Sequence, residues 1–236
     1  MIPIKDYPGE RRLFPWVMLV IVVLNILAFL YEAMLGERAL DVLFTAAGVV
    51  PVEFTRGVEV GAPPPLNMTW TTLFTSMFLH GGLLHIGSNM LYLFVFGDNI
   101  EDRLGHMRFL IFYLVCGIVA GFTHILVNAG SPIPSIGASG AIAGVLAAYL
   151  RLFPSADVRT LLFIGPFIAM PRIRATFLII FWFITQFLSG VMSLGATSEQ
   201  TSGVAVWAHV GGFVAGFLLV QFIAPPRRPA FAAARY

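Results

Sequence analysis

Four polar side chains in otherwise apolar stretches of the sequence have the types needed for acyl transfer. Ser139 offers a hydroxyl nucleophile and His209 an imidazole base, while His85 and Asn89 offer side-chain donors. A serine hydroxyl needs a base to take its proton, and a tetrahedral intermediate needs donors for its oxyanion. The backbone N–H of Ser139 is a further donor if a helix begins there, because the first N–H groups of a helix have no internal partner. The chemistry indicated is peptide-bond hydrolysis.

The composition surrounding these residues is that of a membrane protein. Of the 236 residues, 58% are hydrophobic and 11% are charged, and the mean hydropathy is +0.87. A soluble domain carries about 25% charge, so the composition excludes a disordered chain and disfavours a soluble one. The net charge of only +2 predicts no nucleic-acid partner. The single cysteine, Cys116, cannot form an intramolecular disulfide.

Six apolar segments approach the roughly 20 residues that a membrane-spanning helix needs. We therefore predict an all-α polytopic membrane protein with six transmembrane helices in one domain covering residues 1–236. The predicted helices are 16–35, 83–100, 109–127, 137–153, 175–191 and 204–223, followed by a short basic tail, 224–236.

The distribution of charge predicts how these helices are oriented. With six spans, Arg38 and Arg56 fall on one side of the membrane, and the other 12 of the 14 Lys and Arg fall on the opposite side. Because basic loops stay in the cytoplasm, both termini are predicted to be cytoplasmic. We expect a multi-pass protein of a prokaryotic cytoplasmic (inner) membrane, with its polar cluster toward the outer face.

Two connecting segments carry structure of their own. The long outer loop, 36–80, includes an amphipathic stretch at 70–79 that we predict to be an interfacial helix. On the cytoplasmic side, the apolar segment 160–170 contains Pro166 and is too short to span a membrane. We predict that this second segment is an interfacial or re-entrant piece.

The helix orientations place the four polar side chains at one depth. The second, fourth and sixth helices all enter from the outer side, and a rise of about 1.5 Å per residue puts His85, Asn89, Ser139 and His209 within roughly 3–10 Å of their outer ends. We expect no carboxylate in the outer half of the spans, so the prediction is a dyad rather than a triad. Glycines at G-x-x-x-G spacing in the fourth and sixth helices favour close packing between them.

The remaining polar residues receive plainer interpretations. We expect His124 to be structural, His106 to be a solvated residue of a cytoplasmic loop, and His80 to mark the outer boundary of the second helix. Ser88 lies beside Asn89 in the same polar turn, and Gln186 in the fifth helix is left without a role. Each of the four candidate site residues could alone be a packing or hydrogen-bonding residue, so the prediction rests on their shared depth.

Four short segments stand out in chain order. They are His80-Gly81-Gly82-Leu83-Leu84-His85 followed by Asn89, Glu101-Asp102-Arg103-Leu104-Gly105, Gly137-Ala138-Ser139-Gly140, and Ala208-His209-Val210-Gly211-Gly212-Phe213-Val214-Ala215-Gly216. Together, from about Trp70 to Gly216, they resemble the signature segments of the rhomboid family of intramembrane serine proteases. The resemblance implies a rhomboid-like bundle as the fold, with Ser139 as the nucleophile and His209 as the general base. It also implies that His85, Asn89 and the Ser139 N–H form the oxyanion hole.

The chain departs from the family pattern at two positions. Trp70 is followed by Thr71 where many members have arginine, and Ala143 stands where some members carry an aromatic residue that stacks on the base histidine. The second departure raises the question of what holds the ring of His209. Trp207 or another aromatic side chain is the expected substitute.

The function predicted is an intramembrane serine endopeptidase that cleaves transmembrane protein substrates near the outer face, within the lipid bilayer. No cofactor and no metal are implied. Trp182 and Phe183 of the fifth helix, with the outer loop, are plausible elements of a substrate gate. The alternatives are a non-catalytic rhomboid-like scaffold that binds membrane proteins, and a small transporter. A transporter would have polar residues along a complete path, whereas these gather on one side.

Overall fold

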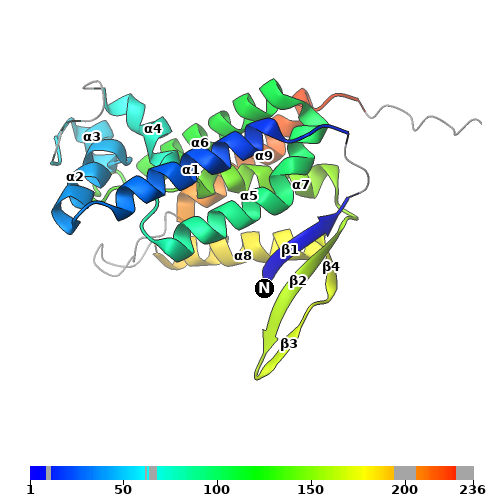
Figure 1. Cartoon of the computed structure of the whole chain (residues 1–236). Helices are drawn as coiled ribbons and strands as arrows, with labels where there is room; N and C mark the ends of the chain where they lie inside the picture. The colour runs from blue at the N-terminus through cyan, green and yellow to red at the C-terminus, as the bar shows by residue number, and fades with distance from the viewer. Residues whose placement is uncertain (9–11, 62, 64–67, 194–205, 227–236) are drawn as a thin grey trace, which may run out of the picture.

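The computed structural model describes residues 1–8, 12–61, 63, 68–193 and 206–226 (Figure 1). The chain is mostly helical, with one small sheet. The α-helices are α1 (Trp16–Ala33), α2 (Glu37–Ala47), α3 (Pro51–Arg56), α4 (Thr72–Thr75), α5 (Leu83–Leu104), α6 (His106–Val127), α7 (Ser139–Leu152), α8 (Ala175–Ser193) and α9 (Val206–Ile223). Two 3-10 helices are η2 (Thr69–Thr71) and η3 (Ser76–Phe78), and the strands are β1 (Ile2–Tyr7), β2 (Asp157–Ile164), β3 (Phe167–Ala169) and β4 (Arg172–Arg174).

The long helices coincide with the six predicted segments to within a few residues. Four of them, α1, α6, α8 and α9, are long and apolar enough to cross a membrane, and Thr69–Phe78 with α5 makes a fifth candidate that is bent by 82°. α7 has 14 residues, fewer than the roughly 20 of a typical span. The chain is thus a multi-pass membrane protein, while six spans and cytoplasmic termini stay predictions. The start of the last predicted span, 204–205, and the tail from 227 lie outside the described residues.

The two ends of the bundle differ in character. One end carries α2, α3 and the segment Thr69–Phe78, and we call it the outer end, following the charge-based prediction. At the opposite end, α5 and α7 terminate, α8 begins and the sheet is attached; we call this the basic end (Figure 1). The predicted interfacial helix at 70–79 is divided into η2, α4 and η3.

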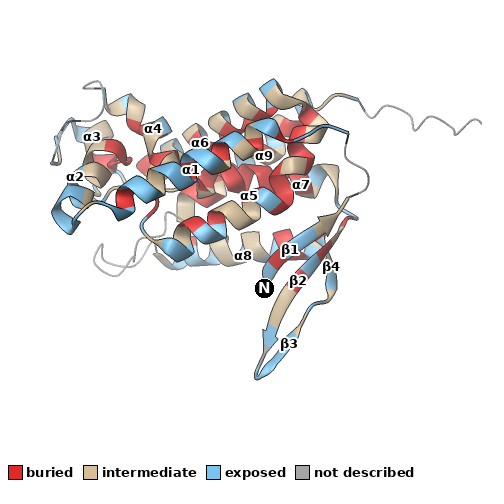
Figure 2. Cartoon of the chain, in the orientation of Figure 1, coloured by how far each residue is buried: buried red, intermediate tan, exposed pale blue. Residues whose placement is uncertain are grey.

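α7 is the central helix of the bundle. Every residue from Gly140 to Tyr149 is buried, and Figure 2 shows buried residues concentrated in the middle of the bundle. α9 packs most extensively against α6 and α7. By contrast, α1 and α8 expose many large apolar side chains, including Leu27 and Phe181, as lipid-facing helices do.

Glycines allow the backbones of α7 and α9 to touch, as the G-x-x-x-G spacing predicted. A Cβ atom on Gly144 would lie 3.1 Å from the carbonyl oxygen of Gly212, and one on Gly216 would lie 2.5 Å from the Cα of Gly144. A Cβ on Gly212 would overlap the carbonyl of Gly140. Side chains are therefore excluded at this crossing, and the outer ends of α7 and α9 lie close together.

The all-α prediction is wrong for two segments, which form a four-stranded sheet. β1 pairs antiparallel with β2, and β2 also pairs with β3 and β4. The segment 160–170, expected to be an interfacial or re-entrant piece, lies in the β2–β3 hairpin, which turns at Gly165 with a φ of 58°. Branched and aromatic residues on both sides of a Gly-Pro turn favour a hairpin, and β1 supplies the extra strand that completes its pairing.

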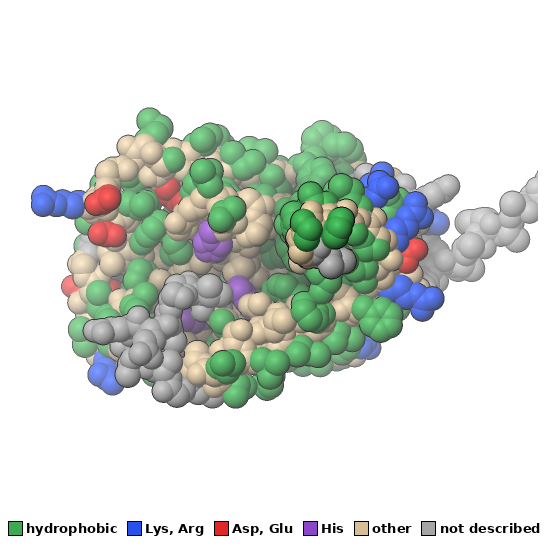
Figure 3. Space-filling view, turned by 90° about the horizontal axis from the view of Figure 1, so that it is seen from below, with side chains coloured by type: hydrophobic (Ala, Val, Ile, Leu, Met, Phe, Trp, Pro, Cys, Tyr) green, Lys and Arg blue, Asp and Glu red, His purple; other side chains and the backbone are tan. Residues whose placement is uncertain are grey.

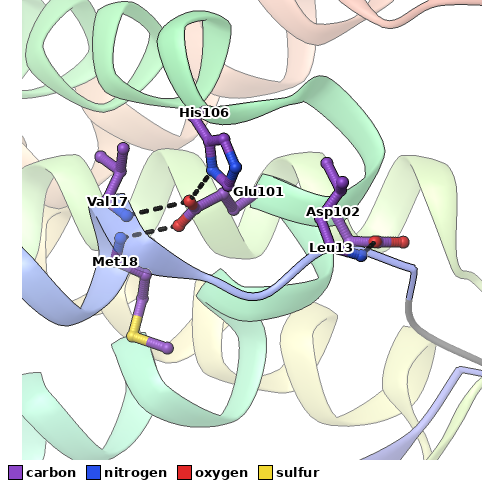
Figure 4. A network of polar contacts seen from close by, with 6 residues as sticks. All are labelled: Leu13, Val17, Met18, Glu101, Asp102 and His106. Atoms are coloured by element: carbon purple, nitrogen blue, oxygen red, sulfur yellow. Dashed lines mark hydrogen bonds and ion pairs between the residues drawn. The ribbon is translucent and has the colours of Figure 1, made fainter.

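Two consecutive acidic residues at the end of α5 hold the beginning of α1 (Figure 4). The carboxylate of Glu101 accepts the N–H groups of Val17 at 2.9 Å and Met18 at 2.7 Å, satisfying donors that have no partner within α1. His106, expected to be a solvated loop residue, begins α6 with 42% of its side chain exposed, and its Nδ1 lies 2.5 Å from the buried Glu101 carboxylate. Asp102 accepts the backbone N–H of Leu13 at 2.6 Å.

Candidate active site

Ser139 and His209 meet at the outer ends of α7 and α9. The Oγ of Ser139 lies 2.7 Å from the Nε2 of His209, within hydrogen-bond distance. Ser139 is the first residue of α7, and Gly137 just before it has a φ of 125°, a conformation that L side chains rarely adopt. His209 lies in the first turns of α9 and is buried. The glycine contacts between α7 and α9 explain how the two side chains come within reach.

The other ring nitrogen of His209 contacts Gln186, which the sequence left without a role. The Nδ1 of His209 lies 2.7 Å from the Oε1 of Gln186 in α8. When the hydroxyl of Ser139 donates to Nε2, Nδ1 carries the ring proton and donates it to this amide oxygen. The hydrogen bond therefore holds one tautomer and one ring orientation. A carboxylate does this in the common triad, and here an uncharged amide occupies the same position.

An aromatic ring also lies beside His209, although Ala143 cannot supply one. The ring centroids of Trp182 and His209 are 5.8 Å apart, with an angle of 41° between the planes. Trp182 and Gln186 are four residues apart and so share one face of α8. The substitute is thus Trp182 of α8, whereas Trp207 lies against Phe187. α8 holds His209 from two sides.

His85 and Asn89 of α5 face the same space as the Ser–His pair. A Cβ on Gly137 would lie 2.8 Å from the Nε2 of His85 and 3.7 Å from the Oγ of Ser139, so the imidazole rests against the backbone beside the serine. The Nδ2 of Asn89 is buried and has no hydrogen-bond partner among the described residues. A buried, unpaired amide donor is unfavourable unless something accepts from it, and an oxyanion in the cleft would do so.

These groups line a cleft of about 720 Å³. Its walls come from α5, α7, α8 and α9. Its polar lining is His85, Ser88, Asn89, Ser139, Gln186 and His209. Apolar side chains such as Ile142, Leu146 and Tyr92 complete the lining. Figure 3 shows histidine side chains within a hollow on the side of the bundle, so the cleft opens along the flank rather than at an end.

The expectation of an outer half free of carboxylates is wrong because of Glu32. This residue lies near the outer end of α1, is buried, and accepts the backbone N–H of His80 at 3.2 Å. The imidazole of His80 is buried and packs edge-on against that of His85, with 5.0 Å between the ring centroids. Glu32 therefore holds the loop before α5. Among the described residues it forms no hydrogen bond with His209, whose orienting group is the uncharged amide of Gln186.

The remaining polar residues lie around or away from the cleft. The Oγ of Ser88 donates to the carbonyl of His85 at 3.0 Å, within α5. The Nδ1 of His124 lies 3.3 Å from the Nδ2 of Asn128 at the end of α6, which agrees with a structural role.

A comparison with known protein families identifies the chain. Residues 67–226 match the Rhomboid domain, and this range includes all four signature segments and every residue of the cleft described above. The chain belongs to the rhomboid family.

Similar curated proteins come from bacteria, plants and animals. The rhomboid chain is 32% identical to "Rhomboid protease GluP" of Bacillus subtilis (strain 168) over 69% of its own length and 28% of that protein. It is 26% identical to "RHOMBOID-like protein 1" of Arabidopsis thaliana over 87% of its length and 52% of that protein. It is 29% identical to the human "Presenilin-associated rhomboid-like protein, mitochondrial" over 67% of its length and 39% of that protein. The chain thus spans about half or less of these relatives.

Proposed function

We propose that this rhomboid-family chain is an intramembrane serine endopeptidase that cleaves transmembrane protein substrates near the outer face of the membrane. The observation that carries the proposal is the 2.7 Å contact between Ser139 Oγ and His209 Nε2, with the opposite nitrogen of the ring bonded to Gln186. A hydroxyl, a base and a group that orients the base are the parts that activate a serine nucleophile.

The first half of the reaction forms an acyl-enzyme. The Oγ of Ser139 attacks the carbonyl carbon of the scissile bond as the Nε2 of His209 takes the hydroxyl proton. The resulting oxyanion accepts hydrogen bonds from Asn89, His85 and the backbone N–H of Ser139. The helix dipole favours negative charge there as well, because Ser139 begins α7. When the intermediate collapses, the C–N bond breaks and His209 returns the proton to the leaving amine.

The second half releases the new carboxyl end. Water attacks the ester on Ser139, His209 accepts the water's proton, and the ester bond breaks as that proton returns to Oγ. Developing positive charge on His209 is stabilised by the Oε1 of Gln186 and by the ring face of Trp182. No step uses a cofactor or a metal.

The flank opening supports entry of substrate from the lipid. A transmembrane helix shields its own carbonyl groups, so the substrate has to unwind locally before Ser139 can reach one. We further propose the cytoplasmic membrane of a prokaryote as its location, with the cleft nearer the outer face. Relatives named as mitochondrial and chloroplastic show that the family also occupies organelles.

The test compares purified wild type, Ser139→Ala and His209→Ala in lipid vesicles with a reporter transmembrane substrate. Ser189→Ala, which alters an exposed serine on α8 outside the cleft, is the matched control. We expect cleavage by wild type and Ser189→Ala only, and fluorophosphonate labelling that disappears in Ser139→Ala. Substrate binding without cleavage by the wild type would favour the scaffold alternative, and equal cleavage by all four proteins would exclude the dyad.

A further inference from the structure

The tip of the β2–β3 hairpin is apolar and projects from the protein. The exposed fractions are 62% for Phe163, 73% for Phe167, 63% for Ile168 and 54% for Met170. Phe163 and Ile168 are opposite each other in the hairpin, so their side chains lie on the same face of the sheet. Adjoining exposed apolar side chains on a projecting element indicate a surface that another apolar phase covers.

The base of the same sheet carries a row of positive charge. Arg159 of β2 is directly opposite Lys5 of β1 on one side and Arg172 of β4 on the other. All three side chains are exposed. Like charges directly opposite each other in a sheet are destabilising. In the part of the chain that the structure describes, no carboxylate lies within salt-bridge distance of them.

The charged row shares one face of the sheet with Phe163 and Ile168 of the apolar tip, whereas Phe167 points to the other face. Successive side chains of a strand alternate between faces, so Phe163, four residues beyond Arg159 along β2, points to the same side as Arg159. This face thus changes from basic at the base of the sheet to apolar at the tip. Tyr7 lies at the base, on the side of the charged row away from the tip. The Arg172 guanidinium is 4.6 Å from its ring centre and the Lys5 ammonium is 5.6 Å away.

The sheet is fixed to the basic end of the membrane-spanning bundle. The Nδ2 of Asn99, near the end of α5, donates to the Asp6 carboxylate of β1 at 2.7 Å. The N–H of Ala175, at the start of α8, donates to the carbonyl of Ala156 at 2.8 Å. In Figure 1 the hairpin leaves this end and slants back toward the middle of the bundle's length instead of continuing outward. Its tip is therefore directed toward the level of the lipid-facing helices.

We propose that this sheet binds the membrane leaflet at the basic end of the bundle. The apolar tip formed by Phe163, Phe167, Ile168 and Met170 enters the acyl-chain region, and Lys5, Arg159 and Arg172 bind the phosphate groups of anionic lipids. A lipid leaflet supplies anionic groups and an apolar layer side by side, in the order in which the sheet presents cations and apolar side chains. Phosphate oxygens relieve the like-charge row, which no described carboxylate does.

The test uses a fluorescent reporter on the full-length protein. The only cysteine, Cys116, is buried, so a Cys116→Ala background carries Phe167→Cys labelled with an environment-sensitive dye. Ser155→Cys, an exposed position just before the base of the sheet, is the matched control. Both proteins are placed in vesicles of neutral phosphatidylcholine, with or without anionic phosphatidylglycerol and with brominated acyl chains as quenchers.

We expect the label at 167 to emit at shorter wavelength and to be quenched by brominated chains, whereas the label at 155 is not quenched. Anionic lipid should increase this shift, and the triple variant Lys5→Gln, Arg159→Gln, Arg172→Gln should lose the increase while melting like the parent protein in detergent. A label at 167 that stays in water overturns the proposal. A label at 167 that is shielded from water but not quenched by brominated lipid also overturns it. Shielding that grows with protein concentration would indicate a second copy of the chain as the partner, and shielding that appears only with added substrate would indicate the substrate.

Discussion

Replacing Gln186 with leucine tests whether an uncharged amide does the work of the missing carboxylate. Gln186→Leu keeps a similar side-chain volume and removes the acceptor that lies 2.7 Å from the Nδ1 of His209. A hydrogen bond to a charged partner contributes about 1.5–3 kcal/mol, and the partner becomes charged when His209 holds the serine's proton. Each 1.36 kcal/mol corresponds to a factor of ten in rate. We therefore expect kcat to fall by roughly 10- to 150-fold.

The measurement is the steady-state cleavage of a transmembrane reporter in vesicles, with kcat and KM determined separately. KM should stay near the wild-type value, because the lost interaction strengthens only as charge develops on His209. Gln186→Glu retains an acceptor oxygen at the same reach and should restore most of the lost kcat. Gln221→Leu, the same substitution in α9 at a glutamine that contacts Arg151, should behave like wild type.

The reasoning fails if Gln186→Leu keeps the wild-type kcat, or if its entire effect is on KM. It also fails if Gln186→Glu is as slow as the leucine variant although both proteins melt like wild type. The first result would mean that Trp182 alone orients the ring. The last would mean that the side chain at 186 acts only through packing against α9.

Three further predictions concern the oxyanion donors and the framework. Asn89→Ala should lower kcat by about 10²- to 10³-fold with little change in KM, and an unchanged kcat would remove Asn89 from the oxyanion site. Gly216→Ala should lower the free energy of unfolding by about 1–3 kcal/mol because its Cβ meets the backbone of α7. Its control, Gly87→Ala, has open space around the new Cβ and should be neutral or slightly stabilising in the same denaturation assay. Glu101→Ala should lower the free energy of unfolding by about 3 kcal/mol, because it removes buried hydrogen bonds to the start of α1. Asp102→Ala, whose hydrogen bonds are exposed, should lower it by about 1 kcal/mol. Equal losses in the two variants would contradict the capping role of Glu101.

The clustering of the four polar side chains could be predicted because helix geometry is local. A fixed rise per residue and the orientation of each helix place His85, Asn89, Ser139 and His209 at one level before any packing is known. The glycine spacing likewise indicated which helices approach closely. These inferences depend on neighbouring residues within one helix, and the structure brings all four side chains to one cleft.

The features that escaped prediction depend on contacts between distant segments. Gln186 is one of many residues on an apolar helix, and only the rotation of α8 against α9 turns it toward His209. The pairing of Lys5 with Arg159 joins the N-terminus to a loop far along the chain, so neither strand has a strong signal alone. Glu32 is a different case, because it lies visibly within the first predicted span, and a carboxylate at that depth could have been found from the sequence.

The position of α8 links substrate entry to the state of the base. Trp182 and Gln186 line one side of the cleft through which a substrate would enter, and both also contact His209. An outward displacement of α8 wide enough to admit a helix would withdraw the acceptor from Nδ1 and the ring from the imidazole face at the same time. Because Ala143 leaves α7 without an aromatic residue at this level, nothing on α7 would replace them. If α8 moves to admit a substrate, it would therefore have to return before His209 is oriented to take the proton from Ser139.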